Sequence, residues 1–187
     1  MRQRLVLACL FMFLIGCHGP LDDASMSEIR SRDSYIDLLK NLLTHDEIFY
    51  FNERSESLRL DALNITSEVI TAAKVRWVTD KEFMEVFDKW LPQGEGRVVL
   101  LGIYNKSFKK DDVLKNGSYR AKLQINGVTY EPLDVKEVKQ AFLNRYFPVF
   151  NHWAKVFAFH FPVPMSQEPG ILVVNWPSGV RTLELKP

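Results

Sequence analysis

The chain has 187 residues, of which 47% are hydrophobic and 12% aromatic. That length and apolar content suffice for one domain with a packed core and leave little room for a second full domain. Lys and Arg number 24 against 23 Asp and Glu, which gives a formal net charge of +1. This balance excludes the strongly basic footprint of a nucleic-acid-binding protein, so no nucleic-acid partner is expected.

The amino terminus has the layout of a secretory signal. Arg2 and Arg4 precede an unbroken apolar run from Leu5 to Ile15, in the order of a basic n-region and an apolar h-region. As a helix rising about 1.5 Å per residue, this run spans only about half of a hydrocarbon core that is about 30 Å thick. We therefore expect residues 1–16 to be a cleaved signal peptide and not a permanent membrane span.

The signal ends in Leu14-Ile15-Gly16-Cys17, which resembles the lipobox of bacterial lipoproteins. The resemblance covers all four positions and implies transfer of diacylglycerol to the Cys17 thiol. It also implies cleavage before Cys17 by the lipoprotein signal peptidase and acylation of the new amino group. Cys17 is therefore the expected lipidation site. Two or three acyl chains anchor a protein stably to a membrane.

The residue after the cysteine bears on the location of the protein. In Gram-negative envelopes an aspartate there favours retention in the inner membrane, whereas this chain has His18. We therefore expect the periplasmic face of the outer membrane. Because Cys9 would be removed and Cys17 lipidated, the mature chain would keep no thiol, which excludes disulfides, cysteine nucleophiles and thiolate metal sites.

The mature chain is predicted to be a short tether followed by one domain. Residues 17–24 would form the lipidated tether and residues 25–187 a single globular domain, helix-rich over 25–92 and strand-rich over 97–187. Removal of the signal takes two of the 24 basic residues and leaves 22 against 23 acidic ones. The mature net charge is then −1, and we expect a monomer.

The first half of the domain reads mainly as helices. Ser25-x-x-Glu28 is a capping box, and the spacing of apolar residues predicts a helix from there to Thr44, followed by a short aromatic stretch at 48–51. Alternation predicts a strand over 58–64. Two further helices are predicted, one over 67–76 capped by Thr66, and one that begins with the capping box Thr79-x-x-Glu82 and is stopped by Pro92 and Gly94.

The second half reads mainly as strands, with a type I′ hairpin signal at Asn126-Gly127. One short helix is predicted among them, capped by Asp134-x-x-Glu137, with Val138, Ala141 and Phe142 on its buried side and its end near Pro148. The predicted strands cover 98–104, 119–125, 128–130, 155–161, 171–176 and 180–185.

This succession predicts an α+β protein, an antiparallel immunoglobulin-like β-sandwich with an N-terminal helix and inserted helices. Residues 57–187 also resemble uncharacterised bacterial envelope lipoproteins, through Tyr146-Phe147-Pro148 and the strand led by Trp153. The resemblance implies this sandwich and no activity. In the strand over 155–161, we expect Phe157, Phe159 and Phe161 to face the core and Val156, Ala158 and His160 to face a wetter side.

Patterns that carry chemistry are scarce. His152 and His160 lie eight residues apart, which fits no short metal motif. Pro177-Ser178-Gly179 and Asn116-Gly117-Ser118 read as turns and not as nucleophile elbows. The carboxylate pairs Asp22-Asp23 and Asp111-Asp112 lie in hydrophilic stretches. No catalytic residue, metal site or cofactor is predicted, and whether the protein is an enzyme stays open.

The leading interpretation is a lipid-anchored envelope protein of non-enzymatic type whose sandwich presents a surface to another envelope component. Its expected partners are a membrane, through lipid on Cys17, and an envelope protein. One alternative is a periplasmic carrier of an apolar ligand, and another is a hydrolase of envelope polymer. An exposed apolar patch would favour the first, an enclosed cavity the second and convergent carboxylates in a cleft the third.

Overall fold

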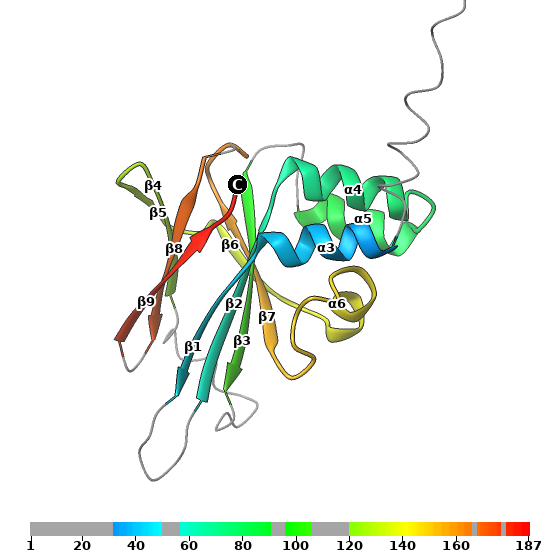
Figure 1. The fold of residues 1–187 in the computed structure, drawn as a ribbon. Coiled ribbons are helices and arrows are strands. Elements are labelled where there is room, and N and C mark those ends of the chain that lie inside the picture. Colours follow the sequence, from blue (N-terminus) through cyan, green and yellow to red (C-terminus); the bar gives the residue numbers. More distant parts are fainter. Residues whose placement is uncertain (1–31, 50–56, 91–95, 106–119, 166–167, 177–178) are drawn as a thin grey trace, which may run out of the picture.

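A computed structural model describes residues 32–49, 57–90, 96–105, 120–165, 168–176 and 179–187. These residues form two antiparallel sheets and a layer of helices (Figure 1), which confirms the mixed α+β class and the pair of antiparallel sheets. The helices are α3 (Arg32–Leu42), α4 (Ser67–Trp77), α5 (Lys81–Trp90) and α6 (Gln140–Tyr146). The predicted signal peptide, the lipobox with Cys17, and the tether lie outside the described residues.

The larger sheet has the strand order β1-β2-β3-β7-β6 and the smaller one β5-β4-β8-β9. The first consists of β1 (Leu43–Phe49), β2 (Ser57–Ile65), β3 (Arg97–Asn105), β7 (Lys155–Phe161) and β6 (Asp134–Val138). The second consists of β5 (Val128–Tyr130), β4 (Arg120–Ile125), β8 (Gly170–Trp176) and β9 (Gly179–Leu185). All six strands predicted after residue 97 are confirmed. Between β4 and β5, Asn126 and Gly127 both have positive φ, at 50° and 79°, as the predicted hairpin turn requires.

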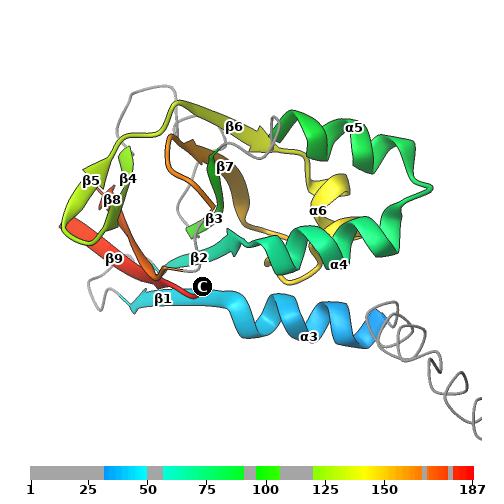
Figure 2. The same ribbon diagram turned by 90° about the horizontal axis from the view of Figure 1, so that it is seen from above.

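The larger sheet is the middle layer, with the smaller sheet on one face and the helices on the other (Figures 1 and 2). Each interface has its own core. Between the sheets, the buried residues include Leu60, Val99, Leu123, Phe159, Leu172 and Leu183. Between the sheet and the helices they include Leu39, Leu63, Val69, Phe83, Leu100, Phe142 and Val156.

Strand β7 shows the consequence of this middle position. Phe157, Phe159 and Phe161 are 1%, 3% and 0% exposed and pack against the smaller sheet, as predicted. The opposite face is not a wet one, because Val156 and Ala158 are buried beneath the helices. The prediction for that face was wrong since a strand in the middle layer needs apolar side chains on both sides, and β7 reads as a nearly continuous apolar run.

The predicted first helix was wrong at its end. Helix α3 stops at Leu42, and β1 begins at Leu43, so Thr44 and His45 lie in a strand. Residues 43–49 pair one for one with residues 57–63 of β2. The backbone hydrogen bonds of that ladder outweigh the local helical spacing, which continues through Leu43 in the sequence. The helix-rich half therefore contributes two strands to the larger sheet.

Two predicted helix starts also need correction. Asp134 and Glu137 do not cap a helix, because residues 134–138 form β6 and pair with β7 at the edge of the larger sheet. Helix α6 begins only after Lys139, which makes no side-chain cap, and Ala141 is exposed. At α5, the cap is Asp80 and not Thr79.

The Asp80 carboxylate accepts a hydrogen bond of 3.2 Å from the Phe83 amide, as an N-cap residue does. Thr66 was predicted correctly, since its hydroxyl oxygen accepts from the Val69 amide at the start of α4. These two caps define where α4 and α5 begin.

A buried guanidinium links the two sheets at one end. Arg97, at the start of β3, is 0% exposed. Its Nε donates to Asn64 Oδ1 at 2.9 Å, and its Nη1 donates to the Glu168 carbonyl at 3.1 Å. Asn64 in turn donates to the Lys186 carbonyl just after β9. Burial lowers the pKa of Arg97, and the nearby Glu168 charge opposes that shift.

Within the described part of the chain, no helix has the length and apolar character needed to cross a membrane.

Candidate functional site

Two surface hollows lie on the helical layer and share Tyr35 in their lining. This residue belongs to α3, is 3% exposed, and its hydroxyl donates a hydrogen bond of 3.0 Å to the Tyr146 carbonyl at the end of α6. Burial raises the pKa of Tyr35, and the Arg76 charge only partly opposes this. Tyr35 is therefore a neutral hydrogen-bond donor that joins the first helix to a helix 111 residues later in the chain.

The larger hollow is a groove of about 520 Å³ between α3 and α4. Its apolar wall comes from Tyr35, Leu38 and Ala72, and its polar rim from hydroxyls and one carboxylate. The Thr71 hydroxyl donates to the Ser67 carbonyl at 2.8 Å, so it is engaged within its own helix. The full lining is Ser34, Tyr35, Leu38, Ser67, Glu68, Thr71 and Ala72.

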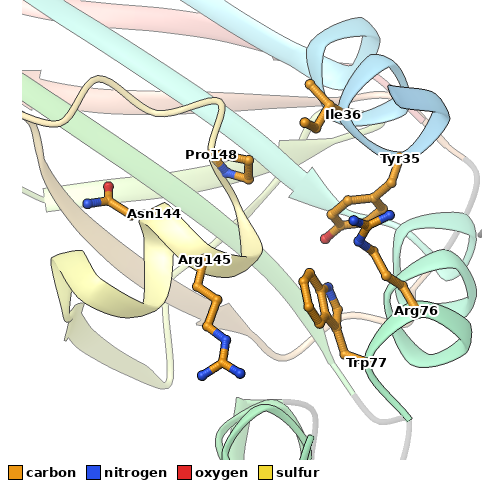
Figure 3. A pocket seen from close by; sticks show the side chains of 7 residues that line it. All are labelled: Tyr35, Ile36, Arg76, Trp77, Asn144, Arg145 and Pro148. Atoms are coloured by element: carbon orange, nitrogen blue, oxygen red, sulfur yellow. The ribbon is translucent and has the colours of Figure 1, made fainter. Parts of the chain in front are cut away.

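The smaller hollow, of about 270 Å³, lies where α3 and α4 approach the end of α6 (Figure 3). The Arg76 guanidinium covers two aromatic rings here, with its central carbon 5.8 Å from the Tyr35 ring centre and 4.9 Å from that of Trp77. Such cation–π contacts hold a guanidinium in place. The full lining is Tyr35, Ile36, Arg76, Trp77, Asn144, Arg145 and Pro148.

Arg145 borders the smaller hollow from α6 and is fixed by two carboxylates. Its guanidinium lies 2.7 Å from Asp80 Oδ2 and 3.7 Å from Glu82 Oε2. The Tyr146 hydroxyl donates to the same Asp80 oxygen at 2.7 Å. That hydrogen bond is the main reason why the pKa of Asp80 is lowered, while burial and the contact with Asp80 raise the pKa of Tyr146 to about 12.

A cluster of aromatic rings supports this end of the helical layer. Phe83 lies with its ring centre 4.7 Å from that of Phe87 and 4.9 Å from that of Tyr146. The Trp77 ring meets Tyr146 edge to face at 5.1 Å. Aromatic pairs in this range are attractive beyond their buried area. Trp77, which lines the smaller hollow, is thus packed against this cluster.

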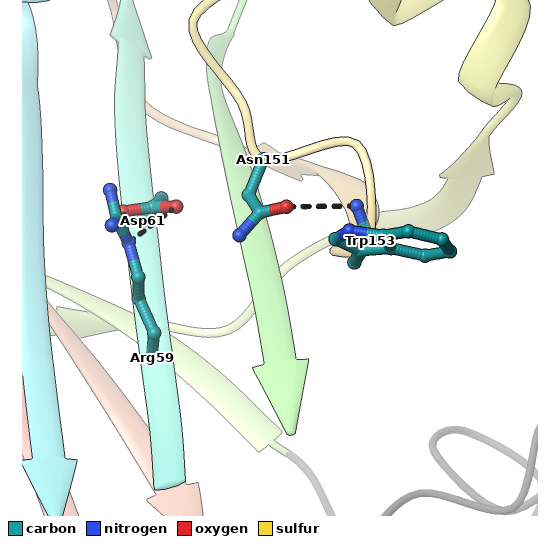
Figure 4. Close-up of polar contacts among 4 residues, drawn as sticks. All are labelled: Arg59, Asp61, Asn151 and Trp153. Carbon is teal, nitrogen blue, oxygen red and sulfur yellow. Dashed lines mark hydrogen bonds and ion pairs between the residues drawn. The ribbon is translucent and has the colours of Figure 1, made fainter. Parts of the chain in front are cut away.

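A polar region lies on the helix-facing side of the larger sheet (Figure 4). Arg59 Nε is 2.9 Å from the Asp61 carboxylate, which is 1% exposed. Burial raises the pKa of Asp61, and the hydrogen bond from Arg59 opposes this. Beside it, Asn151 Oδ1 accepts from the Trp153 amide at 2.9 Å in a turn that leaves the Trp153 side chain 71% exposed. Because Arg59 and Asp61 are engaged with each other, this pair is better explained as support for the sheet than as a ligand site.

The three histidines in the described ranges are not brought together. His45 is exposed on β1, His152 lies in the loop before β7 with its ring 4.5 Å from that of Trp153, and His160 is half-buried on β7. His160 packs against Gly96, where any side chain would collide with the imidazole ring. In the described ranges, no group of three His, Cys, Asp or Glu residues could hold a metal ion. The pairs Asp22-Asp23 and Asp111-Asp112 lie outside those ranges, as do Asn116-Gly117-Ser118 and Ser178.

No protein family model, no curated protein and no solved structure matches this chain. The candidate site therefore stands on its geometry alone.

Sequence reasoning missed the residues that line the hollows. Tyr35, Arg76 and Arg145 come from three separate segments, and no local motif connects them. Of the motifs noted in the sequence, the Tyr146-Phe147-Pro148 turn lies next to the site, through the contacts of Tyr146 with Tyr35 and Asp80. A signal for the site could have come only from knowing which helices pack together.

Proposed function

We propose that this chain is a lipid-anchored, non-enzymatic envelope protein that binds another envelope component through its helical layer. The lipobox and the preceding apolar run support export, cleavage before Cys17 and lipidation of that cysteine. His18 supports the periplasmic face of the outer membrane. The finer fold type is proposed to be immunoglobulin-like. Its support is that the chain crosses between the two sheets after β3, after β5 and after β7.

The observation that carries the binding role is the groove between α3 and α4. Its volume of about 520 Å³ lies in the range of small-molecule and side-chain sites, and its apolar wall is open at the surface. The Tyr35 side chain is held in this wall by the hydrogen bond that its hydroxyl donates to the Tyr146 carbonyl in α6. An apolar segment of a partner, flanked by groups that hydrogen-bond the hydroxyl rim, fits this chemistry. The binding surface is thus proposed on the helices, with the sandwich as their support.

Site-specific photo-crosslinking in the intact envelope tests the proposal. A crosslinking residue at Leu38 should trap a partner at one defined mass. The same residue at Ile171, which is exposed on β8 of the smaller sheet, is the matched control and should not trap it. Cys17→Ala should remove the crosslinked product, because the protein would no longer be anchored beside its partner. Equal products from both positions would contradict the proposed groove.

A carrier of an apolar ligand is the second candidate, and the same groove favours it. The space between the sheets is occupied by side chains such as Leu60, Val99 and Phe159, so the ligand would lie between the helices instead. In the crosslinking experiment, a carrier would give a product heavier by the mass of a lipid and not of a protein. A hydrolase has less support, because Glu68 is the single acidic residue among the described residues that line the two hollows, and glycosidases use two carboxyl groups.

A further inference from the structure

We infer that the exposed ring of Trp153 is a stacking surface for one sugar ring of a glycan, with His152 at its side. The loop that carries both residues lies between α6 and β7 and takes no part in the α3–α4 groove. The inference therefore goes beyond the proposed function, and purified protein alone tests it. Its failure would leave the crosslinking result unaffected, and the reverse also holds.

The exposure of Trp153 is unusual for its residue type. Its side chain is 71% exposed, which is the largest fraction among the exposed large hydrophobic residues of the described ranges, and it is the only aromatic residue among them. Tryptophan is highly buried on average in folded proteins, because its ring is a large apolar surface. The exposed indole therefore leaves a large flat face that a ligand could cover.

The loop holds the backbone of Trp153 in a defined position. Phe150 and Ala154, on either side, are 7% and 4% exposed and belong to the core beneath the helices. Phe150 packs on Gly102 of β3, where a Cβ atom would lie 2.8 Å from its ring. Asn151 closes the turn twice, since its side-chain oxygen accepts from the Trp153 amide and its carbonyl from the Ala154 amide, both at 2.9 Å. A side chain presented by such a turn loses little loop freedom on binding.

The surroundings of the ring favour a sugar over an apolar partner. The exposed His152 imidazole has its centre 4.5 Å from that of the indole, and no hydrogen bond among the described residues engages its nitrogens. The indole points away from Asn151 (Figure 4). The other exposed large hydrophobic residues lie on other elements and turns, namely Val78, Val128, Leu133, Ile171 and Val180. Trp153 is therefore not part of a broad apolar patch, as a protein interface or a membrane-inserting surface would require.

A pyranose ring with equatorial substituents matches this arrangement. Axial C–H groups cover both of its faces, and hydroxyls form its rim. The face of an indole carries partial negative charge and attracts these C–H groups, and burial of the two apolar faces adds to the attraction. At the rim, a neutral imidazole such as that of His152 donates one hydrogen bond and accepts another. The ligand class is thus a glycan of glucose-configured units, with or without N-acetyl groups.

Titration of the full chain with chitotriose, a trimer of N-acetylglucosamine, tests the inference. The detergent must lack a sugar headgroup, because such a headgroup would compete. Calorimetry should show saturable binding with a Kd of about 1 mM or lower. In a nitrogen-labelled sample, the indole N–H signal of Trp153, identified by its loss in Trp153→Phe, should shift, whereas those of Trp77 and Trp176 should not. Cellotriose has the same ring shape without acetyl groups, so weaker binding of cellotriose would assign the ligand to N-acetylated glycans. Absence of saturable binding for both trimers would overturn the inference.

Variants locate the stacking surface. Trp153→Ala should weaken binding of the preferred trimer about five- to tenfold, the loss of one aromatic stacking contact, whereas Trp153→Phe keeps a flat ring and should retain most of the affinity. Leu133→Ala is the matched control and should change nothing, because Leu133 is 68% exposed and lies beside His160, at the other end of β7. Unchanged urea midpoints would show that the exposed substitutions leave the fold intact. Equal affinities of the wild-type and Trp153→Ala proteins would overturn the inference, as would an equal loss in the Leu133 variant.

Discussion

Replacement of Phe159 by alanine tests the packing between the two sheets. Its side chain is 3% exposed, it lies opposite Val99 of β3 and Val135 of β6, and its ring centre is 6.4 Å from that of Phe161. Removal of a buried phenyl ring costs about 3 to 5 kcal/mol, because transfer energy is lost and a cavity remains. Typical domains have only about 5 to 15 kcal/mol of stability, so the variant should be severely weakened.

Val156→Ala tests the other face of the same strand. Val156 is 1% exposed and packs in the core beneath the helices, opposite Val138 of β6. Loss of two methyl groups at about 0.8 kcal/mol each, with a small cavity, gives an expected cost of about 1.5 to 2.5 kcal/mol. If Val156 instead faced solvent, as the alternation alone predicts, Val156→Ala would lower the free energy of unfolding by less than about 0.5 kcal/mol. The two expectations are far enough apart to be separated.

Urea denaturation followed by circular dichroism measures both costs, provided that the slope of the transition stays unchanged. His160→Ala is the comparison within the strand and should cost less than Phe159→Ala, because the imidazole is only half-buried. A cost for Val156→Ala below about 0.5 kcal/mol would refute the packing of the helices on this face. Equal costs for the Phe159 and His160 variants would refute the assignment of the phenylalanines to the core between the sheets.

The anchor, the metal chemistry and the charges can each be tested by one further measurement. Cys17→Ala should abolish labelling by a fatty-acid analogue, and labelling that persists would contradict lipidation at this residue. A chain that starts at Asp22 should fold as a monomer, and a chelator should leave its melting temperature unchanged; a lowered melting temperature would reveal a metal site. The lowered pKa of Asp80 stabilises the fold above the unfolded value of about 4, and this contribution is lost as the pH falls through the folded value. Tyr146→Phe should therefore make the urea midpoint less dependent on pH between about 5 and 3, and an unchanged dependence would contradict the role of this hydrogen bond.

Much of the strand layout could be predicted because its signals are local. Alternation and β-branched or aromatic residues predict β3 to β5 and β7 to β9, and Asn126-Gly127 predicts the turn between β4 and β5 through the positive φ that both residues adopt. The failures occurred where one local pattern fits two structures. Leu43 continues the helical spacing of Leu39 and Leu42, and Asp134-x-x-Glu137 fits an exposed edge strand as well as a helix start.

None of the lining of the two hollows could be predicted. Tyr35 lines one hollow with Ala72 and the other with Arg145, because α3, α4 and α6 pack on the same face of the larger sheet (Figure 2). Helical spacing identifies an apolar face on each of these helices but not which helices become neighbours. The cation–π contact of Arg76 with Tyr35 and the hydrogen bond between Tyr35 and Tyr146 are products of that packing.

By itself, the sequence determined what depends on near neighbours in the chain: the strand periodicity, the Thr66 cap, the hairpin turn and the lipobox pattern that predicts lipidation of Cys17. Tertiary structure decided that residues 43–49 form a strand, that β7 is buried on both faces, and that two cations border one hollow. The physical reason is that backbone pairing and side-chain burial are satisfied by partners that are distant along the chain. In β1, backbone pairing with β2 outweighs the helical spacing of the apolar residues. Alternation alone predicts that Val156 faces water, but in the folded chain the helices cover it.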